Sequence, residues 1–88
     1  RMLGDRSNEL SDYDKAVSLD PKNPAFATER ATTLYQTGKI QQGMTEVNRA
    51  LSLDDKFAPA YYIRANINWV LKQASLALAD LNKALAIE

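Results

Sequence analysis

The sequence predicts an all-α fold of five helices and no strands, built from a repeated helix pair. Three observations support this prediction. Alanines recur 34 residues apart at Ala16, Ala50 and Ala84, which indicates an internal repeat. Apolar residues recur at helical spacing within each copy of the repeat. Proline and glycine stand where helices should begin and end, since Pro24 suits a first turn and Gly38 a left-handed helix end.

Each copy of the repeat supplies its helices in the same order. The second copy predicts one helix from Pro24 to about Thr37 and another from about Ile40 to Leu53. The third copy predicts helices from Pro59 to Leu71 and from Ala74 to Ile87. The first copy contributes a single helix, from about Asp5 to Leu19, and the proline of the following LDP sequence lacks the N–H needed to continue it.

The composition excludes several classes of function. Lysine and arginine total 11, as do aspartate and glutamate, so no basic surplus favours nucleic acid or an anionic membrane as partner. The sequence has no cysteine and no histidine, which removes thiolate metal sites and the commonest general base. We therefore expect no enzyme activity, no metal and no cofactor.

The apolar runs are also too short for a membrane span, which needs about 18 residues. We accordingly expect no membrane insertion in this segment. The lack of cysteine does not fix the compartment, so the location is left unknown, with a soluble, cytoplasmic one favoured.

Acidic and basic residues stand three apart on the second helix of each copy. This spacing brings the two charges of a pair onto one side of a helix, acid first. We expect a solvent-exposed face on which each pair contributes a few tenths of a kcal/mol, roughly 0.2–0.5. The pairs are Asp12 with Lys15, Glu46 with Arg49, and Asp80 with Lys83.

The unit resembles a tetratricopeptide repeat. Its period, its alanine near the end of the second helix and the LDP behind it carry the resemblance, together with small residues at Ala31 and Ala65 in the first helices. Gly43 and Asp55 depart from the family's alanine and proline. The resemblance implies a right-handed superhelical solenoid of stacked antiparallel pairs. It would comprise a partial repeat over 1–23, a second repeat over 24–57 and an uncapped third repeat over 58–88, together one domain of a larger protein.

The resemblance also implies that the first helices line a concave groove that binds extended peptides. Tyrosine and tryptophan offer contact area at low entropic cost, and an asparagine can bond a peptide backbone. The alternative for Trp69 is packing in the core. Arg30 and Arg64 are expected to point toward the neighbouring helix, so a clamp for acidic chaperone tails is not expected. The predicted groove residues are Thr28, Glu29, Thr32, Tyr35, Tyr62, Asn66 and Trp69.

These features indicate a non-catalytic scaffold that binds a protein or peptide partner. A second hypothesis is self-association or structural assembly, because the helix from Ala74 to Ile87 is apolar around much of its circumference. In that case Leu78, Leu81 and Leu85 would form the contact face of a homo-oligomer. A third hypothesis is that the chain is a regulatory segment within a larger protein.

Overall fold

The computed structural model describes residue 15 and residues 18–88, and this part of the chain contains four helices and no strand. They are α2 (Pro24–Gln36), α3 (Ile40–Leu53), α4 (Ala58–Val70) and α5 (Ala74–Ile87), which confirms the all-α prediction. Of the helix predicted from Asp5, only Lys15, Ser18 and Leu19 are described, and they are helical. No described helix is long and apolar enough to cross a membrane.

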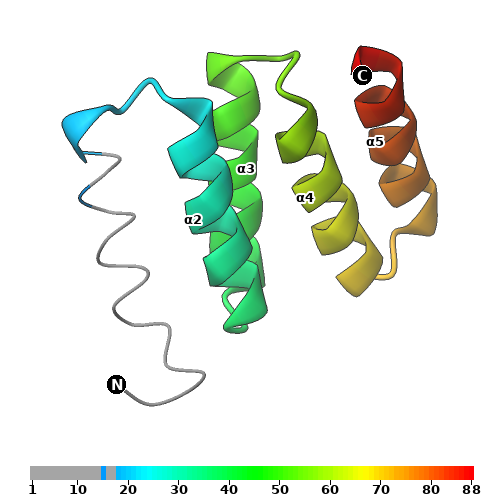
Figure 1. The fold of residues 1–88 in the computed structure, drawn as a ribbon. Coiled ribbons are helices and arrows are strands. Elements are labelled where there is room, and N and C mark those ends of the chain that lie inside the picture. The colour runs from blue at the N-terminus through cyan, green and yellow to red at the C-terminus, as the bar shows by residue number, and fades with distance from the viewer. Residues whose placement is uncertain (1–14, 16–17) are drawn as a thin grey trace.

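The helices form two successive hairpins. Helix α2 packs against α3 and α4 packs against α5, each pair joined by a short turn (Figure 1). Helix α4 also contacts both α3 and α2, which joins the two hairpins. The two first helices are therefore neighbours.

Capping and turn residues explain where the helices begin and end. The Asn23 side chain accepts a hydrogen bond from the Ala25 amide at 2.9 Å, and Pro24 then occupies the first position of α2. The first hairpin turn uses Gly38 at φ 91°, as predicted from the sequence. Lys72 occupies the equivalent position of the second turn at φ 62°, a backbone conformation that costs a non-glycine residue about 1 kcal/mol or more.

Small residues allow the helices of each pair to approach closely. Ala31 is fully buried and Ala65 is 2% exposed, which confirms their expected structural role. A Cβ built at Gly43 would lie 3.1 Å from both the Ala31 carbonyl oxygen and Tyr35 Cβ. Helices α2 and α3 therefore approach each other closely at Gly43. Larger buried side chains, Val47 and Ile67 among them, fill the space between the alanines.

The predicted solvent exposure of the charged face is wrong for the acids of the two copies that the structure describes, although the predicted pair of Glu46 with Arg49 forms at 3.2 Å. Glu46 is 7% exposed and Asp80 is 4% exposed. The reason is that an arginine of the preceding helix reaches each acid: Arg30 lies 3.4 Å from Glu46 and Arg64 lies 2.9 Å from Asp80. Both arginines point toward the neighbouring helix, as expected, and Lys83 forms no ion pair with Asp80 among the described residues.

Candidate functional site

Helix α4 presents Tyr62, Asn66 and Trp69, which follow one another at intervals of four and three residues and so share one side of the helix. Tyr62 is half-buried, Asn66 is exposed and Trp69 is 69% exposed. The alternative of core packing for Trp69 is therefore wrong. Asn66 makes no hydrogen bond to any other described residue, so its amide can bond a ligand on both edges.

The predicted site residues of helix α2 are less accessible to solvent than those of α4. Among its predicted site residues Glu29 is exposed, Thr32 and Tyr35 are half-buried and Thr28 is buried. The Thr28 hydroxyl donates to the Pro24 carbonyl oxygen at 2.7 Å, and the Thr32 hydroxyl donates to the Thr28 carbonyl oxygen at 2.9 Å. Because both hydroxyl protons are used within the helix, these threonines can only accept hydrogen bonds from a ligand.

Glu88, at the end of α5, influences the titration of Tyr62. Hydrogen bonding to the Glu88 side chain, together with partial burial and the negative charge of that carboxylate, raises the pKa of Tyr62 above its ordinary value.

The surface charge of α2 and α4 is neutral to acidic. Their cationic side chains are Arg30 and Arg64, and both are engaged by buried acids of the second helices. Glu29 remains exposed on α2. A partner that needs a cationic clamp from these two helices would not find one.

A cavity of 430 Å³ lies at the end of α4. Trp69, Val70, Lys72 and Ala74 line it, so an indole and an aliphatic wall stand next to one ammonium group. Such a cavity can hold an apolar side chain of a bound segment.

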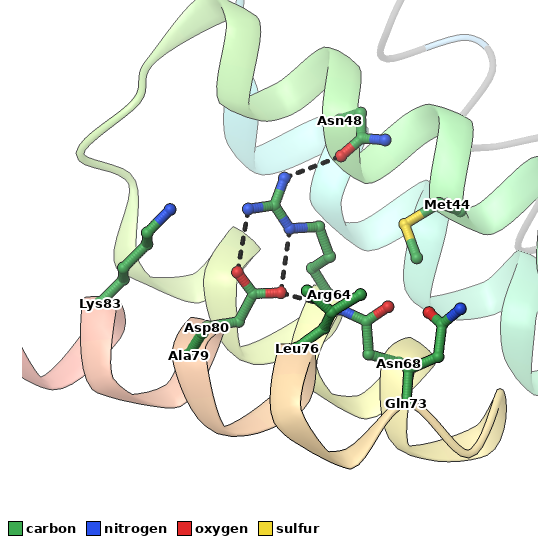
Figure 2. A pocket seen from close by; sticks show the side chains of 9 residues that line it. All are labelled: Met44, Asn48, Arg64, Asn68, Gln73, Leu76, Ala79, Asp80 and Lys83. Atoms are coloured by element: carbon green, nitrogen blue, oxygen red, sulfur yellow. Dashed lines mark hydrogen bonds and ion pairs between the residues drawn. The ribbon is translucent and has the colours of Figure 1, made fainter.

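A second cavity, of 340 Å³, lies between α3, α4 and α5 (Figure 2). At its floor Asp80 accepts three side-chain hydrogen bonds: from Arg64 Nε at 3.0 Å, from Arg64 Nη2 at 2.9 Å and from Asn68 Nδ2 at 3.0 Å. The negative charge of Asp80 is thus paired with Arg64 and both of its oxygens accept hydrogen bonds, which suits a structural role. The sequence pattern did not single out Asn68, which stands where the preceding copy has Leu34.

The described residues contain no group of three or more acidic, histidine or cysteine side chains that could hold a metal ion. The structure brings Tyr62, Asn66 and Trp69 together on α4, next to α2, and it leaves Leu78, Leu81 and Leu85 exposed on α5.

Known proteins resemble the chain in sequence and in fold. No family model matches it. It is 32% identical over 78 residues to the TPR repeat-containing thioredoxin TTL4 of Arabidopsis thaliana, covering 89% of this chain but only 11% of that protein. The solved second TPR of Spaghetti (RPAP3), bound to the HSP90 peptide SRMEEVD, superposes with a TM-score of 0.86 at 20% identity, covering 97% of this chain and 79% of that one. The first TPR of Spaghetti, bound to the same peptide, superposes with a TM-score of 0.82 at 26% identity, covering 90% of this chain and 63% of that one.

Proposed function

Because this chain belongs to the tetratricopeptide repeat family, we propose that it is a non-catalytic interaction module that binds a protein or peptide segment along α2 and α4. The observation that carries the proposal is the exposed pair Asn66 and Trp69, next to Tyr62 on one side of α4. Bound to this side, an extended segment has its backbone against the Asn66 amide and an apolar side chain in the cavity at Trp69.

The proposed partner segment is neutral or basic. The first TPR of Spaghetti binds the acidic peptide SRMEEVD, and a peptide of that kind needs cations where it docks. Here Arg30 and Arg64 are engaged by buried acids and Glu29 is exposed. Acidic tails are therefore repelled on α2, whereas neutral and basic segments are accepted.

A second candidate function is structural assembly through α5. Three exposed leucines support it, since Leu78, Leu81 and Leu85 lie at intervals of three and four residues and form one apolar stripe. The partner in such an assembly is either a second copy of this chain or a different protein.

We also propose the finer architecture that the family implies. The chain divides into a partial repeat over 1–23, a second repeat over 24–57 and a third over 58–88 within a right-handed superhelix. Helices α2 with α3 and α4 with α5 fall inside the last two divisions. The chain spans 11% of its thioredoxin relative, so the activity of any larger protein that contains it is a separate question.

The test is affinity capture from native lysate with the chain and with a double variant, Tyr62→Ala with Asn66→Ala. Loss of the captured proteins in the double variant, at unchanged helicity by circular dichroism, is the expected result. The matched control is Gln41→Ala with Ser75→Ala, two exposed positions on the second helices. Equal capture by the chain and by the Tyr62 and Asn66 variant would sink the proposal.

A further inference from the structure

Each of the two described helix pairs forms a cavity at an equivalent place. The cavity of the first pair, α2 with α3, has a volume of 210 Å³, and that of the second, α4 with α5, has a volume of 340 Å³. A shift of 34 residues maps the lining of the smaller cavity onto residues that line the larger one. The five residues of the smaller cavity are Arg30, Leu34, Gln42, Thr45 and Glu46, and their counterparts are Arg64, Asn68, Leu76, Ala79 and Asp80.

The two cavities differ at the position of Asn68, where the smaller cavity has Leu34. Asn68 is 4% exposed, and its Nδ2 atom donates to Asp80 Oδ2 at 3.0 Å. This hydrogen bond fixes the orientation of the amide, so that Oδ1 points away from Asp80 (Figure 2). The Oδ1 atom accepts no hydrogen bond from any described residue. Because an unpaired acceptor on a buried side chain is unfavourable, the cavity favours a molecule that brings an N–H or O–H group.

Apolar walls and a second amide accompany Asn68 in the lining of the larger cavity. Met44 from α3 is half-buried and Leu76 from α5 is 54% exposed. Gln73, in the turn before α5, also lines the cavity, and its side chain makes no hydrogen bond to another described residue. Figure 2 shows the amides of Asn68 and Gln73 pointing the same way, toward Met44. A ligand can therefore contact apolar surface and still meet two amides that have hydrogen-bonding capacity left.

The charges of the larger cavity disfavour ionised ligands. Its titratable lining residues are Arg64, Lys83 and Asp80, two cations and one acid, so a cationic side chain is repelled. A carboxylate is attracted by the surplus positive charge, but at neutral pH it has no proton to donate to Asn68 Oδ1. A neutral primary carboxamide has both a donor for Asn68 and an acceptor for the Gln73 amide. Of these three ligand types, the carboxamide is the one that pairs with both.

We propose that the larger cavity is a second binding site, which takes a glutamine side chain presented by a partner protein. The NH₂ group of that glutamine donates to Asn68 Oδ1, its carbonyl oxygen accepts from the Gln73 side-chain amide, and its methylenes lie between Met44 and Leu76. Asn68 is two residues from Asn66 and so ~200° around α4 from it. The site is therefore separate from the proposed groove and does not depend on it.

The experiment titrates N-acetyl-glutamine-methylamide, a glutamine with both backbone ends blocked, into the ¹⁵N-labelled chain. Two-dimensional ¹H–¹⁵N NMR follows the side-chain amides, and we expect saturable shifts at Asn68 and Gln73. The equally blocked glutamate and methionine should bind about threefold to tenfold more weakly, as for loss of one hydrogen bond. The indole N–H of Trp69, which lines the separate cavity at the end of α4, should not shift.

Two variants of the chain test the site from inside and outside. Asn68→Leu installs the residue of the smaller cavity and should weaken binding about threefold to tenfold. Because Asn68 also supports Asp80, the second variant is Ala79→Phe, at an exposed position on the cavity wall, which should abolish binding by filling the space. Its matched control is Ala86→Phe, the same change at an exposed position of α5 that does not line the cavity, and this variant should bind normally.

Four results would overturn the proposal. Absence of saturable shifts at Asn68 and Gln73 would mean that water alone occupies the cavity. Equal affinity for the glutamate or methionine probe would remove the carboxamide from recognition, and full affinity in both Asn68→Leu and Ala79→Phe would place binding elsewhere. Tighter binding of free glutamine than of the blocked probe would identify a small molecule, rather than a partner protein, as the ligand.

Discussion

Replacing Asp80 by alanine removes a buried carboxylate that joins α4 to α5. Asp80 accepts two hydrogen bonds from Arg64 and one from Asn68, and its side chain is 6% exposed. Without it the Asn68 amide stays buried without that acceptor, which costs about 1–3 kcal/mol. The Arg64 side chain is 24% exposed and regains water, so its lost pairing adds only about 1 kcal/mol. We expect the free energy of unfolding to fall by about 2–4 kcal/mol.

Urea denaturation followed by circular dichroism measures this loss. With a slope of about 1 kcal/mol per molar urea for a domain of this size, the midpoint should fall by about 2 M or more. Asp55→Ala, an exposed acid in the loop before α4, is the control and should change stability by less than about 0.5 kcal/mol. Adding Asn68→Leu to Asp80→Ala should restore part of the loss, because it removes the stranded donor. Equal midpoints for Asp80→Ala and Asp55→Ala would refute the reasoning.

The remaining predictions concern packing, charge and titration. Gly43→Ala should lower the melting temperature. Overpacking against the Ala31 carbonyl oxygen costs about 1–3 kcal/mol, which exceeds the gain of about 1 kcal/mol in helix propensity. A stabilised variant would contradict the close approach of α2 and α3 at this position. Glu29→Lys should strengthen binding of the peptide SRMEEVD severalfold at low salt, measured by calorimetry, and an unchanged affinity would contradict the charge argument. Glu88→Gln should lower the pKa of Tyr62, read from tyrosinate absorbance as the difference from Tyr62→Phe. Because folding raises this pKa, protonated Tyr62 contributes to the free energy of unfolding. That contribution is complete below the pKa of the unfolded chain, about 10, and is lost as pH rises through the pKa of the folded chain. Glu88→Gln should remove this contribution.

The sequence predicted the helices well because their limits are local. Proline at the starts of α2 and α4, Gly38 at φ 91° and apolar periodicity act within a few residues, and the predicted bounds of α3 and α5 agree with the structure. The exposure of Asn66 on α4 also follows from helical period alone.

The burial of the acids was missed because it depends on another helix. The spacing of Asp80 and Lys83 describes α5 alone, whereas the actual partner, Arg64, lies 16 residues earlier on α4. A signal was present, since arginine and an acid recur together as Arg30 with Glu46 and as Arg64 with Asp80. The burial of Thr28, in the helix that contacts α4, was likewise not readable from the period of α2.

Trp69 offers the most direct measurement of the central proposal, because it is the single tryptophan of the chain and is 69% exposed on α4. Acrylamide quenching of its fluorescence should be strong for the free chain. When the chain is saturated with a partner segment that lysate capture identifies, we expect reduced quenching and a blue-shifted emission, since the segment excludes water from the indole. Unchanged quenching and emission at saturation would contradict binding on this side of α4.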